Sequence, residues 1–236
     1  MITITSDAER LVGVFGDVLQ RQVPFALSLA LTDTAHEART AMQRHIDGVF
    51  DMPTPFTRNA FQVKPARKDD LVAVLEQKAD NRRRDYLGVE DAGGPRGQTG
   101  FERLLGRRVA FAGDIRSVLP ADNARLDKYG NWSAGQRNQV LSALQAQRDS
   151  TSNTSETSAK RNKGKRLTYF VPQTGLTPGI YSRNAAGDLG VVAIFSGAVP
   201  SYSPRLAFYE TVSTAVLAKF GPNFERRFAG AATTAR

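Results

Sequence analysis

The most constraining feature of this sequence is an unbroken amphipathic repeat between residues 24 and 49. Apolar or small side chains recur there every three or four residues, at Leu27, Leu31, Thr34, Ala35, Ala38, Met42, Ile46 and Val49. This spacing predicts one α-helix, roughly 39 Å long, with a continuous apolar face. Pro24 opens the segment and Pro53 and Pro55 end it, because proline fits the first turn of a helix and interrupts its interior. We interpret it as a core helix that packs against a sheet or a second helix.

Short apolar runs predict antiparallel strands beside this helix. Residues 61–64 and 71–75 are expected to pair through a turn at 67–70. Three further strands are expected at 167–171, 180–183 and 189–195, the last two joined by a hairpin turn.

Capping residues predict where the remaining helices begin. Thr99–Glu102 and Ser133–Gln136 both match the capping box. In this motif the side chain of the first residue accepts the backbone N–H of the fourth, and the side chain of the fourth accepts the backbone N–H of the first. Before the long helix, residues 1–5 predict a short strand, and Ser6 or Asp7 can cap a helix that follows it.

The C-terminal part of the chain predicts one more helix. Ser203 and Pro204 are expected to cap it. Gly221 and Pro222 are expected to break it, with a restart at Asn223.

Together these elements predict an α+β fold in a single domain covering residues 1–236. Long N-terminal helices would pack on a small antiparallel β-sheet, with a C-terminal helix and extended loops or arms. An inserted arm is expected at about 81–132, because its first part is polar and glycine-rich. Residues 149–165 contain no large apolar side chain and predict a mobile polar loop.

The composition excludes several kinds of active site. The chain has no cysteine and two histidines, so disulfides, thiolate nucleophiles and Cys-type zinc sites are ruled out. His36 and His45 would lie roughly 13.5 Å apart along one helix, too far to share a metal ion. No cofactor and no metal are expected. The apolar runs are too short to cross a membrane, and the N-terminus lacks the pattern of a secretory signal, so we expect a cytoplasm as the site of synthesis.

Two further motifs resemble catalytic sites only in part. Asp70 and Glu76 precede Lys78 as in many nucleases, but on one strand their carboxylates would lie roughly 20 Å apart, too far to share magnesium. Residues 93–100 are glycine-rich but lack the Gly-Lys-Ser/Thr end of a phosphate-binding loop. The sequence predicts no catalytic residue, and we expect the protein not to be an enzyme.

The basic excess is the remaining functional signal. The formal net charge is +9, and the Lys and Arg residues gather around residues 82–84, 103–108, 160–166 and 226–227. A nucleic-acid footprint predicts a single basic face, with aromatic residues interleaved for single strands. Charge dispersed over four regions favours a solvated surface or a complement to an acidic protein neighbour. Nucleic-acid binding stays as the alternative.

Three groups of strings occur in colinear order along the chain. The first is FDMPTPFTRNAF at 50–61, with VKPARK at 63–68 and GGPR and FE within 93–102. The second is LDKYGNWSAGQ at 126–136, and the third combines PGIYSR at 178–183 with YSPR at 202–205. Together they resemble a family of bacteriophage tail proteins described as minor tail protein Z-like, or as tail-completion and neck components.

This resemblance implies a structural virion protein without enzymatic activity at the head–tail junction. Such proteins assemble with copies of themselves as rings, usually sixfold, between the portal or adaptor proteins and the tail, and DNA passes through the lumen. No membrane partner is implied. The residues that the resemblance marks as candidate interface positions are Pro53, Pro55, Phe56, Gly93, Gly94, Arg96, Phe101, Glu102, Leu126, Asp127, Tyr129, Gly130, Asn131, Gly135, Gln136, Gly179, Arg183, Tyr202, Pro204 and Arg205.

Two alternatives to a neck component stay open. The first is a phage protein that binds or processes DNA. The second is a tail assembly chaperone that is absent from the mature virion.

Overall fold

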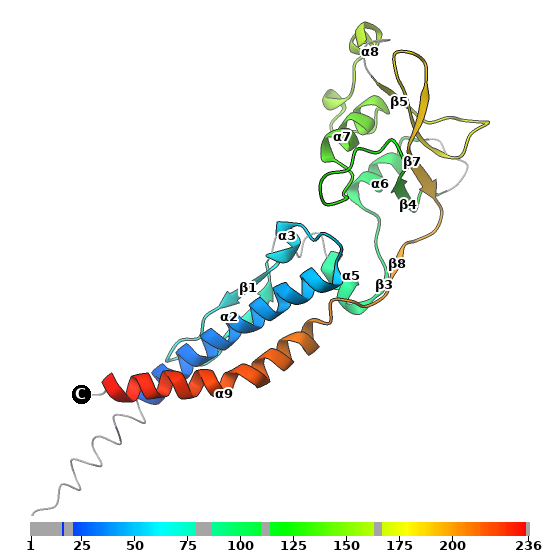
Figure 1. Cartoon of the computed structure of the whole chain (residues 1–236). Coiled ribbons are helices and arrows are strands. Elements are labelled where there is room, and N and C mark those ends of the chain that lie inside the picture. The colour runs from blue at the N-terminus through cyan, green and yellow to red at the C-terminus, as the bar shows by residue number, and fades with distance from the viewer. Residues whose placement is uncertain (1–15, 17–20, 79–85, 110–113, 163–166, 235–236) are drawn as a thin grey trace, which may run out of the picture. The chain divides into compact units, whose positions relative to one another are not determined.

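The computed structural model describes residues 16, 21–78, 86–109, 114–162 and 167–234, and it has the predicted α+β fold (Figure 1). The chain divides into two compact units. Unit 1 comprises Met1–Ala92 with Pro204–Arg236, and unit 2 comprises Gly93–Ser203. This differs from the single domain expected from the sequence, because each unit has a hydrophobic core of its own.

Unit 1 is built on two long helices that lie side by side, α2 (Val23–Val49) and α9 (Phe208–Thr234) (Figure 1). The buried residues of α2 are small over its first four turns and larger near its end: Ala26, Ser28, Ala30, Thr34, Ala35, Ala38, Met42 and Ile46. Leu27 and Leu31 are only half-buried, so the buried face is centred on the alanines. Small residues let a second helix approach closely, as the sequence predicted for this segment.

Four short elements lie beside these helices in unit 1. Strands β1 (Phe61–Lys64) and β2 (Val74–Gln77) form the expected antiparallel hairpin against α2, although the second strand starts three residues later than predicted. Helix α3 (Pro55–Arg58) follows α2, and α5 (Tyr86–Ala92) lies where an arm was expected. Leu87 of α5 is buried in the same core as Met42 and Phe61, which is why this segment folds as a helix.

Helix α9 differs from its prediction at both its start and its middle. It begins at Phe208, whose backbone N–H donates to Asp91 Oδ1 at 2.8 Å, so the first turn is capped by a residue from α5 and not by Ser203. It also runs through Pro222 without a break. A proline inside a helix costs about 3 kcal/mol. Lys219 and Asn223 contact α2 on either side of Pro222 and favour the continuous helix.

Unit 2 holds a four-stranded antiparallel sheet and several short helices. The strands lie in the order β4 (Ser117–Pro120), β7 (Leu189–Ser196), β6 (Gly179–Arg183) and β5 (Thr168–Phe170). Strands β5, β6 and β7 match the three predicted strands, whereas β4 was not predicted. Two shorter strands, β3 (Gly94–Pro95) and β8 (Ser201–Tyr202), pair with each other.

The helices of unit 2 are α6 (Gly100–Gly106), α7 (Ala134–Ala143), a 3₁₀ turn at Ser150–Ser152 and α8 (Glu156–Asn162). The arm expected at 81–132 therefore contributes α5 to unit 1 and β3, α6 and β4 to unit 2. Its apolar residues Leu105, Ile115 and Val118 are buried in the core of unit 2 with Val140, Ile180 and Phe195.

The polar segment predicted as a mobile loop is folded over residues 149–162. Asp149 accepts the N–H of Thr151, and the N–H of Thr154 donates to the Ser142 carbonyl of α7. Hydrogen bonds, in place of apolar contacts, hold this segment. Residues 163–165 of the predicted loop, and the strand and helix predicted before residue 16, lie outside the described residues.

We predict opposite effects for two glycine substitutions in unit 2. A Cβ atom at Gly179 would overlap the backbone carbonyl of Ala193 on β7, whereas a Cβ at Gly135 in α7 would meet open space. Gly179→Ala should lower the free energy of unfolding by about 1–3 kcal/mol. Gly135→Ala, its control, should be neutral or stabilise by up to about 1 kcal/mol. Urea unfolding of both variants measures this, and equal effects would contradict the packing at Gly179.

Candidate functional site

The Glu102 carboxylate lies at the centre of a buried polar cluster in unit 2. Its side chain is only 2% exposed. Arg96 donates to both of its oxygens, at 2.7 and 2.9 Å, in a bidentate ion pair. The backbone N–H of Thr99 donates at 2.6 Å and that of Val118 at 3.1 Å. Thr99 Oγ1 accepts the Glu102 N–H in return, so the predicted capping box of α6 is confirmed.

These contacts keep Glu102 ionised and link it to the edge of the sheet. Burial alone would raise the pKa of Glu102, but the hydrogen bonds from Arg96, Thr99 and Val118 outweigh it and lower the pKa to about 2. Because Val118 belongs to β4, a strand at the sheet edge, its N–H would otherwise be an open edge donor. The carboxylate therefore joins α6 to the edge of the sheet.

The glycines before Arg96 determine its position. Gly93 and Gly94 have φ angles of 75° and 96°, which glycine adopts without strain. Gly94 then pairs with Tyr202 across β3 and β8, and the Arg96 N–H donates to the Pro200 carbonyl. Four predicted positions, Gly93, Gly94, Arg96 and Glu102, thus belong to one intramolecular arrangement.

A second buried cluster surrounds Trp132 and Gln136. Gln136 Oε1 accepts the indole N–H of Trp132 at 2.7 Å and the backbone N–H of Arg125 at 2.6 Å. Its Nε2 donates to the Asn123 carbonyl at 3.0 Å. Only half of the predicted capping box forms, since Ser133 accepts the Gln136 N–H while the Gln136 side chain turns to these other partners. The Phe101 ring meets Trp132 edge to face at 5.0 Å.

The strand-like turn before α7 is held by Asp127. Its Oδ1 accepts the backbone N–H groups of Tyr129 and Asn131, and Gly130 adopts a φ of 75°. The pKa of Asp127 is lowered by these backbone hydrogen bonds, first by that of Asn131. Leu126 in the same turn is 55% exposed. It is one of the few predicted interface positions whose apolar side chain faces solvent.

The Arg205 side chain forms a corresponding cluster in unit 1. Its guanidinium donates to Glu90 Oε2 at 3.0 and 3.1 Å and lies over the Phe50 ring at 5.2 Å. The Glu90 carbonyl accepts the backbone N–H groups of Arg205 and Leu206. His45 Nε2 lies 3.2 Å from the Arg205 carbonyl. This cluster ties α5 and α2 to the segment that enters α9, and Pro204 lies exposed directly before it.

The remaining predicted positions are dispersed. In unit 1, Pro53 precedes the cap residue Thr54 of α3, Pro55 occupies the first turn, and Phe56 is 41% exposed beside Tyr86. In unit 2, the Arg183 guanidinium lies over the Phe170 ring. The motif residues thus occur in both units, and most of those described above make contacts within their own unit. Their role at an interface stays a prediction.

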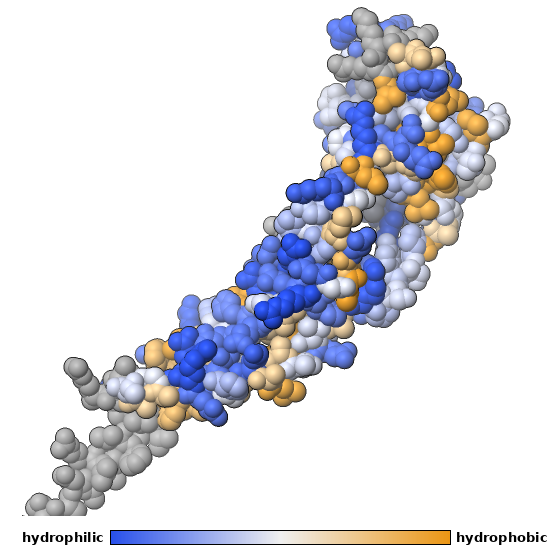
Figure 2. Space-filling view, viewed as in Figure 1, coloured by the Kyte–Doolittle hydropathy of each residue, from blue (hydrophilic) through white to orange (hydrophobic). Residues whose placement is uncertain are grey.

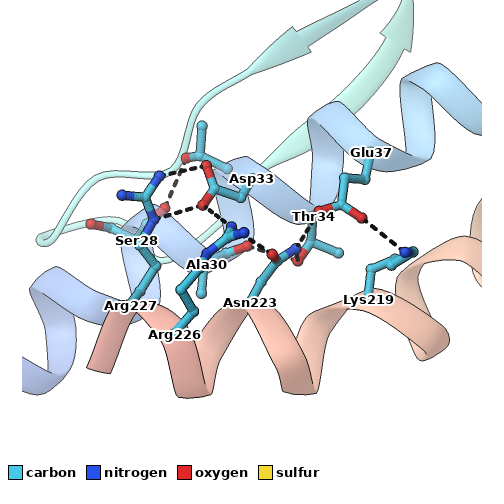
Figure 3. A network of polar contacts seen from close by, with 10 residues as sticks. Ser28, Ala30, Asp33, Thr34, Glu37, Lys219, Asn223, Arg226 and Arg227 are labelled. Atoms are coloured by element: carbon cyan, nitrogen blue, oxygen red, sulfur yellow. Dashed lines mark hydrogen bonds and ion pairs between the residues drawn. The ribbon is translucent and has the colours of Figure 1, made fainter. Parts of the chain in front are cut away.

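A polar network between α2 and α9 was not predicted from the sequence (Figure 3). Asp33 of α2 accepts hydrogen bonds from Arg227 at 2.6 and 2.9 Å and from Arg226 at 2.9 Å. Asn223 Nδ2 donates to Thr34 Oγ1 at 3.1 Å and to Glu37 Oε1 at 3.2 Å. Hydrogen bonds from Arg227, the largest cause, lower the pKa of Asp33. The basic pair at 226–227 is therefore occupied inside unit 1.

One side of α9 carries apolar residues that this network leaves uncovered. Phe220, Phe224 and Phe228 stack along the helix at centroid distances of 6.3 and 5.7 Å, and all three are half-buried. Leu217, three positions before Phe220, is 84% exposed. We call these four residues the apolar edge of α9. This edge was not predicted, because the expected break at Pro222 divides it, although the spacing 217, 220, 224, 228 is that of one helix face.

The structure keeps the excluded catalytic motifs apart. Asp70 lies in the hairpin turn, while Glu76 pairs with Lys64 on the neighbouring strand at 2.9 Å. No three His, Asp or Glu side chains within the described ranges are grouped closely enough to hold a metal ion. None of the helices in the described part of the chain has the length and apolar character needed to cross a bilayer.

No protein-family model, no curated protein and no solved structure matches this chain.

We predict that unit 2 loses stability in acid through Glu102. A carboxyl whose pKa is lowered by folding stabilises the protein above its unfolded pKa, near 4.5, and this contribution is lost as pH falls toward 2. The free energy of unfolding should fall by about 3 kcal/mol over this window. Glu102→Gln should flatten this pH dependence and destabilise at neutral pH, whereas the exposed Glu156→Gln should change neither. Urea unfolding at several pH values between 2 and 7 measures the free energy of unfolding of each variant.

We also predict that Asp33 contributes more to unit 1 than an exposed carboxylate does. Asp33→Asn removes the negative charge and replaces one of the two acceptor oxygens with an N–H donor that faces the arginines, so it should lower the free energy of unfolding by about 1–3 kcal/mol. Asp47→Asn removes a pair with Arg58 in which both side chains are 44% exposed, so it should cost less than about 1 kcal/mol. Thermal unfolding of the two variants compares them, and equal losses would count against the α2–α9 network.

Proposed function

We propose that this chain is a structural virion protein of a tailed bacteriophage, a neck or tail-completion component that forms a ring at the head–tail junction. In this role it would contact copies of itself and join the head-side connector to the tail. The three colinear groups of strings described above support the assignment to this class of protein.

The observation that carries the proposal is the apolar edge of α9. A single exposed leucine on a soluble protein needs no explanation. Here, however, Leu217 extends a stack of three half-buried phenylalanines along one side of a long helix. Contiguous apolar surface of this kind marks contact sites between proteins. A second copy of the chain is the occupant that a ring requires, since repeated heterologous contacts close a ring when the rotation between copies is right.

The surface of the chain suits a protein that works by association. Figure 2 shows hydrophilic residues over most of the visible surface, with apolar residues between them. The chain has 32 Lys and Arg residues against 23 Asp and Glu residues, a formal net charge of +9, so positive charge is in excess. A positive surface complements acidic protein rings above and below.

We predict that Leu217→Glu weakens self-association of the full-length chain. Burying a leucine contributes about 2 kcal/mol, and a carboxylate in its place adds a desolvation cost, so the dissociation constant should rise at least about tenfold. Ala218→Glu is the matched control, because Ala218 is exposed one position along α9 and lies off the apolar edge. Native mass spectrometry and negative-stain microscopy over a concentration series would follow the ring, which we expect to contain six copies.

Two outcomes of these experiments would contradict the proposal. A wild-type chain that stays monomeric at every concentration would contradict the proposal that it forms a ring. Absence of the protein from purified virions, measured by mass spectrometry, would favour an assembly chaperone. If the ring forms and Leu217→Glu leaves it intact, the ring does not use the apolar edge of α9.

A further inference from the structure

A hollow of about 480 Å³ in unit 2 lies between the end of α6 and the start of β4. Three arginines line it. Arg103 and Arg107 come from α6 and its last turn, and Arg116 comes from the opposite wall, directly before β4. Gln98, Val109 and Ile115 are among the other lining residues. Positive charge therefore reaches this hollow from two elements that are separate in sequence.

The two carboxylates in the hollow are already engaged by arginines. Glu102 is held by Arg96, and Asp114 pairs with Arg116 at 2.8 Å. Arg103 and Arg107 have exposed side chains and no acidic partner in the part of the chain that the structure describes. The hollow thus keeps two guanidinium groups whose charge is not neutralised.

The spacing of these two arginines suits a polyanion. Arg103 lies in α6, and Arg107, four positions on, is its C-cap residue and keeps a helical backbone, so their Cβ atoms lie about 6 Å apart on one side of the helix end. Each guanidinium presents five N–H donors, whereas one carboxylate offers two oxygens. A chain of phosphate groups supplies anionic oxygens at successive positions, and arginine binds phosphate with two parallel hydrogen bonds.

We propose that this arginine hollow binds phosphate groups of a nucleic-acid backbone. The contact is electrostatic and independent of base sequence, because phosphate groups are the same at every position of the backbone. This inference rests on the proposed function, in which DNA passes through the ring, and it names the residues that contact the DNA. Its test is separate, because a ring can form with or without this contact.

The test compares two double variants of the full-length chain that lose the same charge. Arg103→Gln with Arg107→Gln alters the hollow. Lys160→Gln with Arg161→Gln is the control, because these residues are exposed on α8 and do not line the hollow. Fluorescence anisotropy with a labelled random-sequence DNA duplex, between about 50 and 200 mM salt, gives the affinity and its salt dependence. Circular dichroism before binding verifies that each variant is folded.

We expect the wild type to bind with an affinity that falls steeply with salt. The slope of log K against log salt should become shallower by about 2 in the Arg103 and Arg107 variant, close to one per lost phosphate contact. The control variant should keep the wild-type slope. Equal changes in the two variants would overturn the proposal, because net charge alone would then explain the binding. Absence of binding by the wild type at about 50 mM salt would overturn it as well.

Two competitors distinguish the sources of negative charge. Inorganic phosphate, compared with chloride at equal ionic strength, should displace the duplex only weakly if successive phosphates are needed. Full displacement by inorganic phosphate would show that a single free phosphate is the ligand. Polyglutamate binding that depends on Arg103 and Arg107, with no such dependence for DNA, would overturn the proposal in favour of an acidic protein partner. None of these outcomes depends on whether the ring forms.

Discussion

Unit 2 depends on one buried carboxylate. Glu102 begins α6 through its capping box, holds the β3 segment through Arg96, and accepts the edge N–H of β4 through Val118. Four donors converge on two oxygens, so the charge is compensated where water is excluded. An amide at this position would offer one acceptor oxygen and two N–H groups facing other donors. The ionised form is therefore required by the geometry, which is the physical reason for a pKa near 2.

Unit 1 depends on the contacts that fix the register of α2 against α9. The small buried residues along most of α2 allow α9 to approach closely. Asp33 favours the observed register, because its two oxygens accept hydrogen bonds from Arg226 and Arg227 of α9. Asn223 adds a second fixed point against Thr34, one residue after the proline. The same contacts hold the C-terminal half of α9 in line and so explain its continuity through Pro222.

The parts of the fold that could be predicted are those determined by residues close together in the sequence. The repeat of α2, the hairpin at 61–77, the Thr99 cap and the three strands after residue 167 all follow from spacing, turn residues and caps. What escaped prediction depends on partners far along the chain. Strand β4 exists because Val118 pairs with Phe195, and α9 starts where Asp91 caps it. Its passage through proline likewise depends on residues of α2.

The same distinction separates stability from function in the candidate residues. Glu102, Gln136 and Arg205 meet partners inside their own units, so the strings around them are explained by folding whatever the protein does. A functional surface must instead consist of groups that folding leaves unsatisfied. In unit 1 those groups are apolar, and Leu217 extends them into solvent. In unit 2 they are the two α6 arginines in a hollow whose acids are already paired. An apolar edge requires another protein surface to exclude water, whereas unpaired guanidinium groups require an anion. The two surfaces differ in chemistry, so each would select its own class of partner: the apolar edge a second protein surface, and the arginine hollow an anionic strand.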